Sequence, residues 1–156
     1  MSNNFLRRVD LIFDQDCNLK DILKSTYQRN NDEIINELLE SGLKGRGGAG
    51  FPTALKWKFT SEQPEPDKYV VCNADEGEPG TFKDREILFK VPLKVFGGMA
   101  ICAKVINAKE GFLYLRGEYR FLLPELEKQL DSFHATLKEL GSDFKIRIIM
   151  GRGAYI

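Results

Sequence analysis

The sequence predicts an α/β fold in which helices flank a mostly parallel sheet. Three apolar runs are short, continuous and bounded by loop residues, as buried parallel strands are; they cover residues 69–72, 111–116 and 144–150. Helical patterns fill the intervals between these runs, and this alternation is typical of strand–helix–strand units. Because such units join parallel strands by right-handed crossovers, we expect a Rossmann-like arrangement.

The helical segments carry recognisable start and stop signals. Asn18 belongs to the residue types that cap helices, Gly42 suits a left-handed helix end, and Pro52 suits a first helical turn. Together with the periodic apolar positions, these signals predict helices over residues 19–29, 32–41, 53–59, 83–89, 93–107 and 118–140. In the last of these, Pro124 is expected near the start of the main body of the helix.

The order of these segments divides the chain into two parts. We expect an N-terminal helical segment, residues 1–44, and a ligand-binding domain, residues 45–156. The third strand runs into a glycine turn, but the sequence ends at Ile156 without the helix that should follow such a loop. We therefore expect the domain to be truncated at its C-terminus, which would expose apolar residues of the third strand such as Ile146, Ile148 and Met150 or their neighbours.

Composition argues against several classes of protein. The 23 basic and 23 acidic residues balance, so neither nucleic acid nor an anionic membrane is expected as the main partner. No apolar run approaches the roughly 20 residues that span a bilayer, and the N-terminus lacks the apolar core of a secretory signal. Cys17, Cys72 and Cys102 are too few and too widely spaced for a disulfide framework or a four-cysteine metal site. The single histidine, His134, is expected on a helix surface or at an interface.

A glycine-rich loop, residues 45–50, has the character of a phosphate cradle. Four of its six residues are glycine, which lets backbone N–H groups approach a ligand closely. A helix is expected directly after the loop, so its N–H donors and dipole favour an anion, and Lys44, Arg46 and Lys56 add positive charge. The loop lacks both the Lys-Ser/Thr ending of an ATPase P-loop and the preceding strand of an ordinary dinucleotide fingerprint. A flexible surface loop is the alternative.

An acidic turn, residues 74–80, follows the first strand at the end where open α/β sheets bind ligands. Asp75, Glu76 and Glu78 are too many carboxylates for a phosphate site, and they suit hydroxyls, ring N–H groups and an amide. Asn73, just before the turn, offers both a donor and an acceptor. The alternatives are a Mg²⁺ or Ca²⁺ site, although no EF-hand pattern is present, and a solvated acidic turn.

Both stretches are similar to the hallmark motifs of one protein family. The NADH-binding flavoprotein subunit of respiratory complex I resembles this chain at residues 45–59, GRGGAGFPTALKWKF, and at residues 72–85, CNADEGEPGTFKDR. The diaphorase subunits of NAD-reducing hydrogenases and formate dehydrogenases are relatives with the same motifs. The resemblance also includes residues 114–119, YLRGEY, and residues 151–156, GRGAYI. Two long motifs in the right order and spacing are highly specific.

The resemblance implies roles for individual residues. Those expected to bind FMN are Gly45, Arg46, Gly47, Gly48, Lys56, Asn73, Asp75, Glu76 and Tyr155. Those expected to bind NADH are Phe51, Phe59 and Glu78. The glycine-rich loop and Lys56 would hold the FMN phosphate and ribityl groups, the acidic turn would contact the ribityl chain and flavin edge, and Tyr155 would lie near the flavin. The two phenylalanines would sandwich adenine, and Glu78 would bind hydroxyls or the amide on the nicotinamide side.

The function that this resemblance implies is that of an NADH dehydrogenase or diaphorase subunit. NADH would give a hydride to FMN, and electrons would pass to iron–sulfur subunits that feed a quinone, hydrogenase or formate dehydrogenase partner. No side chain is needed as a general base, so no catalytic residue is assigned. The alternatives are a non-catalytic nucleotide-binding scaffold and an inactive fragment. We expect residues 1–156 alone to bind FMN much more weakly than the full-length parent and to show little or no NADH oxidation.

The same resemblance limits what else the chain should hold. The [4Fe–4S] cluster of the family belongs to a four-cysteine motif beyond residue 156, and the three cysteines of this chain do not match its ligands. No metal, nucleic-acid partner or direct membrane insertion is expected. The expected location is cytoplasmic, or peripheral on the cytoplasmic side of a membrane complex.

Overall fold

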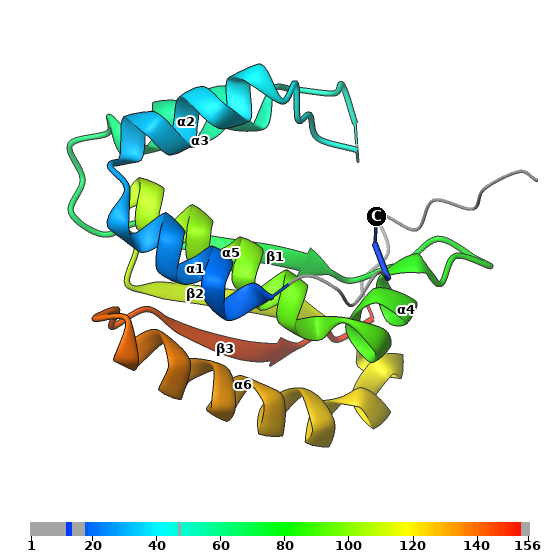
Figure 1. Cartoon of the computed structure of the whole chain (residues 1–156). Helices are drawn as coiled ribbons and strands as arrows, with labels where there is room; N and C mark the ends of the chain where they lie inside the picture. Colours follow the sequence, from blue (N-terminus) through cyan, green and yellow to red (C-terminus); the bar gives the residue numbers. More distant parts are fainter. Residues whose placement is uncertain (1–11, 14–17, 47, 154–156) are drawn as a thin grey trace, which may run out of the picture.

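A computed structural model describes residues 12–13, 18–46 and 48–153, and its centre is a three-stranded parallel sheet (Figure 1). The strands β1 (Tyr69–Ala74), β2 (Glu110–Leu115) and β3 (Lys145–Met150) lie side by side in chain order. Both pairs are parallel, and the first residues of the three strands stand in register. The predicted parallel sheet is confirmed, and each strand boundary lies within two residues of the expected one.

Helices occur at all the predicted places: α1 (Leu19–Gln28), α2 (Asn31–Glu40), α3 (Thr53–Ser61), α4 (Lys83–Lys90), α5 (Pro92–Ile106) and α6 (Leu123–Glu139). The segment predicted as a helix over residues 118–140 is divided: a 3-10 helix, η1 (Gly117–Leu122), precedes α6, and the main body begins beside Pro124, as expected. Pro124 lies in the first turn of α6, where no intrahelical N–H bond is required of it. The α-helix therefore begins at this proline, and the tighter helix forms before it.

Side-chain caps set the starts of the first two helices. Asn18 Oδ1 accepts from the Asp21 backbone N–H at 3.3 Å, in agreement with the predicted cap. α2 begins one residue earlier than predicted because Asn30 and Glu33 form a reciprocal capping box, with distances of 2.9 and 3.3 Å. Gly42 follows α2 with a φ of 65°, a left-handed conformation that glycine adopts without strain.

Helices cover one face of the sheet. α5 and α6 pack against it, and α1 packs on α5 (Figure 1). The opposite face leaves Val71 65% and Ile149 41% exposed. Of the apolar residues expected to be exposed on the third strand, Ile146 is not: it is 3% exposed because the strand alternation turns it toward the helices. The exposed apolar residue is its neighbour in the strand, Ile149, which the expectation also allowed. Ile148 and Met150, two and four residues further along the same strand, are partly buried against the same core.

The N-terminal helices share the core of the sheet. Leu23 of α1 and Ile34 and Ile35 of α2 belong to the same cluster of buried apolar side chains as Phe96 of α5 and Phe133 of α6. The rings of the two phenylalanines lie 5.8 Å apart between their centroids. The helices before the glycine-rich loop therefore help to hold the sheet in place.

His134 connects α6 to β3, a strand at the edge of the sheet. Its Nε2 accepts a hydrogen bond from the Ile146 backbone N–H at 3.0 Å, which requires a neutral imidazole. Burial and the nearby charge of Lys145 lower the pKa of His134 below its ordinary value of 6.5. The half-buried ring thus occupies a helix–strand interface, one of the two positions predicted for it.

We expect the chain to lose stability as the pH falls below the ordinary histidine pKa of 6.5. In that range an unfolded chain binds a proton at His134, whereas the folded chain binds it only at lower pH, so the stabilisation is complete above the window and declines within it. His134→Gln supplies a neutral oxygen acceptor and should weaken this pH dependence. Urea unfolding of both proteins at about pH 7 and about pH 5 measures the difference. Parallel losses in the two proteins would contradict this role for His134.

Candidate functional site

The loops that follow the three parallel strands meet at the carboxyl ends of these strands. Gly151, after β3, donates its backbone N–H to the Leu115 carbonyl oxygen at 2.6 Å. A Cβ atom on Gly117, after β2, would lie 2.9 Å from the Gly151 carbonyl oxygen, and one on Gly151 would lie 3.5 Å from Asp75 Oδ1. Gly117 therefore has no room for a side chain at the place where the loops cross. Asp75 of the acidic turn lies at this junction.

An open cavity of about 450 Å³ lies at this end of the sheet. It is lined by the glycine-rich loop, the acidic turn and the start of α4, through Arg46, Asn73, Asp75, Glu76, Gly77, Glu78, Thr81, Lys83 and Asp84. Its volume falls in the range of about 300–1,000 Å³ that is usual for small-molecule sites. Acids outnumber cations in the lining, so the cavity suits hydroxyl and amide donors, with positive charge available from Arg46 and Lys83.

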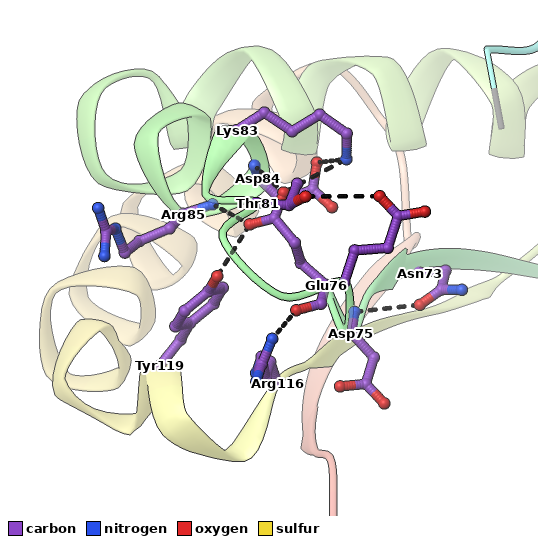
Figure 2. A network of polar contacts seen from close by, with 10 residues as sticks. Asn73, Asp75, Glu76, Thr81, Lys83, Asp84, Arg85, Arg116 and Tyr119 are labelled. Carbon is purple, nitrogen blue, oxygen red and sulfur yellow. Dashed lines mark hydrogen bonds and ion pairs between the residues drawn. The ribbon is translucent and has the colours of Figure 1, made fainter. Parts of the chain in front are cut away.

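Glu76 is the acid of the turn that points into the protein (Figure 2). Its carboxylate accepts from the Tyr119 hydroxyl at 2.8 Å and from the backbone N–H groups of Asp84 and Arg85 at 3.0 and 3.4 Å. Lys83 Nζ lies 3.4 Å from the same carboxylate. Burial opposes ionisation, but these donors outweigh burial and lower the pKa of Glu76. The carboxylate caps the first turn of α4, whose own N-cap residue makes no side-chain hydrogen bond.

Short local bonds hold the other polar groups of the acidic turn. Asn73 Oδ1 accepts from the Asp75 backbone N–H at 3.1 Å, and the Thr81 N–H donates to the Glu78 carbonyl oxygen at 3.1 Å. Gly80 permits this turn with a φ of 80°. Glu78 is exposed, and its carboxylate accepts from the Thr81 hydroxyl at 3.4 Å. Asp75 and Glu78 are therefore the carboxylates of the turn that a ligand can reach.

The glycine-rich loop is closed at its base. Lys44 and Pro52 form an isolated antiparallel bridge, and the Gly45 N–H donates to the Phe51 carbonyl oxygen at 2.9 Å. A Cβ atom on Gly48 would meet nothing within 4 Å, so space surrounds the loop backbone there. α3 begins directly after the loop without a side-chain cap. The N–H groups of its first turn are the kind of donors that bind anions.

Phe51, just before α3, and Phe59, near the end of α3, lie close together. Their ring centroids are 6.5 Å apart with an interplanar angle of 55°, and both side chains are about half exposed. A flat base that stacks on both rings needs them nearly parallel. The pair is therefore near enough to form a stacking slot, but one ring has to turn before a base can enter.

The structure brings together part of the predicted site. The predicted residues that line the cavity are Arg46, Asn73, Asp75, Glu76 and Glu78. Those that lie on the glycine-rich loop, on α3 or between the two without lining the cavity are Gly45, Gly48, Phe51, Lys56 and Phe59. Gly47 and Tyr155 lie outside the described residues.

Other residues of the cavity were not predicted from the sequence. Thr81, Lys83 and Asp84 line it from the end of the acidic turn and the start of α4. Arg116 and Tyr119 do not line the cavity but contact Glu76 (Figure 2). Arg116 contacts the backbone carbonyl of Glu76, and Tyr119 contacts its carboxylate. Their position in the sequence could have indicated this, because both follow the second strand, whose carboxyl end lies beside that of the first.

Two cysteines belong to the described part of the chain, Cys72 on β1 and Cys102 on α5, and both are free thiols. Burial raises the pKa of Cys72 to about 11. Burial likewise raises the pKa of Cys102 to about 12, although the charge of Lys56 acts in the opposite direction. Both thiols are therefore protonated at neutral pH and weakly reactive. Cys17 is outside the described residues.

The described residues contain neither a cluster of metal ligands nor a membrane-spanning helix. Across residues 12–13, 18–46 and 48–153, no three His, Cys, Asp or Glu side chains gather as metal ligands would. None of the helices described is both long and apolar enough to cross a bilayer.

The chain matches a known protein family and several known proteins. The model of the Nuo51 FMN-binding domain matches residues 38–156. The alpha subunit of the NAD-reducing hydrogenase HoxS of Cupriavidus necator is 43% identical over 163 aligned positions, which cover 100% of this chain and 27% of that protein. The mitochondrial 51 kDa subunit of the NADH-ubiquinone oxidoreductase of Neurospora crassa is 38% identical over 143 positions, which cover 85% of this chain and 29% of that protein.

A solved structure supports the same relationship. In the crystal structure of an NAD⁺-reducing [NiFe]-hydrogenase in the H₂-reduced state, one chain matches with a TM-score of 0.77 and 41% identity. The match covers 85% of this chain and 24% of that one. This chain thus spans less than a third of the length of the relatives described above. Because the family model covers most of the chain, the chain belongs to the family of the Nuo51 FMN-binding domain, in agreement with its motifs.

Proposed function

We propose that this chain carries the FMN- and NADH-binding site of an NADH-oxidising flavoprotein, in which a hydride passes from NADH to FMN. The observation that carries the proposal is the cavity at the carboxyl ends of the strands, where the acidic turn meets Arg46 of the glycine-rich loop. The names of the relatives, an NAD-reducing hydrogenase and an NADH-ubiquinone oxidoreductase, support the same chemistry.

The donors and acceptors around the cavity fit FMN. Arg46 and the backbone N–H groups of the glycine-rich loop suit a phosphate, and the open space beside Gly48 allows its close approach. Asn73 and Asp75 suit the hydroxyls of the ribityl chain. Glu76 already accepts four hydrogen bonds from the protein, so it would act on the ligand by shaping the turn. Roles for Gly45, Gly47, Lys56 and Tyr155 are proposed from the family resemblance alone.

An NADH subsite is proposed beside the FMN site. Phe51 and Phe59 would stack on the adenine after one ring turns, and Glu78 would accept from the hydroxyls or the amide on the nicotinamide side. A carboxylate accepts hydrogen bonds from ribose hydroxyls but repels a 2′-phosphate. The predominantly acidic lining of the cavity therefore favours NADH over NADPH.

The work of the protein in this reaction is positioning. FMN supplies the ring that accepts the hydride when it is bound. The side chains of this chain would bind the two ligands face to face and exclude alternative orientations, which is a large part of catalysis by proximity. No residue is assigned as a general acid or base.

Partners and location are proposed on the same basis. The relatives are named as subunits, so we propose that the protein works within a multi-subunit oxidoreductase and passes electrons to iron–sulfur subunits. The final acceptor would be quinone, hydrogenase or a formate dehydrogenase module. The proposed location is cytoplasmic, or peripheral on the cytoplasmic side of a membrane complex. Within the chain, residues 1–44 are proposed to support the ligand-binding domain at residues 45–156.

A titration with FMN of the purified full-length protein that contains this chain tests the proposal, with the fluorescence of the free flavin as the readout. Saturable quenching is expected, followed by bleaching of the bound flavin when NADH, but not NADPH, is added without oxygen. Binding of nucleotide without flavin reduction would favour the non-catalytic scaffold instead. A full-length protein that binds neither FMN nor NADH would overturn the proposed function.

A further inference from the structure

Two residues that lie far from the acidic turn in the sequence, and do not line the cavity, hold the turn in place. Tyr119 is 43 residues from Glu76 and donates its hydroxyl hydrogen to Glu76 Oε2 at 2.8 Å. Arg116 donates from its guanidinium to the Glu76 backbone carbonyl oxygen, and its other terminal nitrogen pairs with Glu118 at 2.9 Å. Glu76 is therefore held at both its backbone and its side chain (Figure 2).

This arrangement places the fixed residue between the two accessible acids. Asp75 and Glu78 lie on either side of Glu76 in the turn, and both line the cavity, whereas the Glu76 side chain is 2% exposed. A movement of the Glu76 backbone would displace its neighbours by a similar amount. Displacement of hydrogen-bonding groups by about 1 Å is enough to weaken a site strongly. The geometry of the ligand-facing acids thus depends on contacts that never touch the ligand.

Glu76 also connects the turn to α4. Its carboxylate accepts from two backbone N–H groups in the first turn of that helix, at Asp84 and Arg85. Asp84 lines the cavity, and its carboxylate pairs with Lys83 at 2.8 Å. The same buried group therefore sets the position of α4 relative to β1, and the cavity lies between them.

We propose that Tyr119 and Arg116 are positioning residues of the ligand site, which hold the acidic turn in the shape that binds FMN and NADH. Both residues belong to the segment YLRGEY, residues 114–119, and neither lines the cavity, so they act on the site through Glu76. Their importance for ligand binding rests on the proposed function, whereas their hold on the turn does not. The two parts are tested by different measurements.

The decisive variant is Tyr119→Phe, which keeps the buried ring and removes only the hydroxyl donor. Tyr27→Phe is the matched control, because the Tyr27 hydroxyl donates to Ser142 Oγ at 3.1 Å in a half-buried place that does not line the cavity. Each variant loses one tyrosine hydrogen bond. A general loss of stability would affect both alike, and a positioning role would affect the site in only one.

The FMN dissociation constant and the amide hydrogen exchange of Asp84 and Arg85 are measured for both variants and the unmodified chain. Tyr119→Phe is expected to weaken FMN binding about tenfold, which corresponds to about 1.4 kcal/mol. It should also speed exchange at the two amides, while Tyr27→Phe changes neither. Arg116→Met, which removes the guanidinium donor, should act in the same direction.

Unchanged exchange in Tyr119→Phe would overturn the proposal, and so would faster exchange combined with unchanged FMN affinity. Equal losses of FMN affinity in Tyr119→Phe and Tyr27→Phe would reduce the role to general stability and overturn it as well. FMN affinity is measured in the full-length protein that contains this chain. If its unmodified form does not bind FMN, the proposed function fails on its own, and the exchange measurement still decides whether Tyr119 holds the turn.

Discussion

In the full-length protein that contains this chain, Gly48→Val is expected to abolish the retention of FMN through purification while the fold stays intact. A Cβ atom at this position meets nothing within 4 Å of the protein, so the folded chain has room for the side chain. The same space is the approach proposed for the FMN phosphate, and a branched side chain would fill it. The expected loss is about a hundredfold or more in affinity, equivalent to about 2.7 kcal/mol.

A second glycine provides the control for this prediction. Gly98 of α5 is also exposed, and a Cβ atom there likewise meets nothing within 4 Å. Gly98→Val should leave both the fold and FMN binding unchanged. Fluorescence titration and circular dichroism of the two variants separate the effects. Full FMN affinity in Gly48→Val would mean that the ligand does not approach the glycine-rich loop. The family resemblance predicts the same loss for Gly47→Val.

Glu78→Gln is expected to raise the Michaelis constant for NADH far more than it lowers the FMN content. Glu78 is exposed at the acidic turn and lines the cavity, whereas Glu76 is committed to the protein. Removal of one charged hydrogen bond to a ligand costs roughly 1.5–3 kcal/mol, or about ten- to a hundredfold. An NADH–ferricyanide assay gives the Michaelis constant, and flavin absorbance gives the FMN content.

The control for Glu78→Gln is Glu139→Gln. Glu139 is an exposed glutamate at the end of α6 that pairs with Lys20 at 2.9 Å and does not line the cavity. The same loss of charge there should leave both readouts unchanged. Lost FMN with an unchanged Michaelis constant in Glu78→Gln would reverse the assignment and move Glu78 to the flavin side.

Much of the fold could be predicted because its signals are local. The strands stood out as short apolar runs, and Asn18 and Gly42 marked helix ends that the structure also has. The start of α2 was placed late because the acids of its first turn were counted, whereas the cap lies at Asn30. The break before α6 was missed because the residues before Pro124 read equally well as α-helix or 3-10 helix.

The site was predictable in its members but not in their orientation. Three acids stand in four positions of the acidic turn, and nothing local distinguishes the one that points inward. The choice is made by Tyr119 and by the first turn of α4, whose donors converge on Glu76. Such a contact between distant segments depends on the sheet being assembled, so a single sequence cannot reveal it.

The closed base of the glycine-rich loop has a consequence for the entropy of ligand binding. The bridge between Lys44 and Pro52, with the bond from Gly45 to Phe51, joins the two ends of the loop during folding. The entropy of loop closure is therefore lost before any ligand arrives. A ligand that binds the loop therefore does not lose this part of the binding free energy. A loop of the same composition with an open base would be closed only on binding and would bind its ligand more weakly.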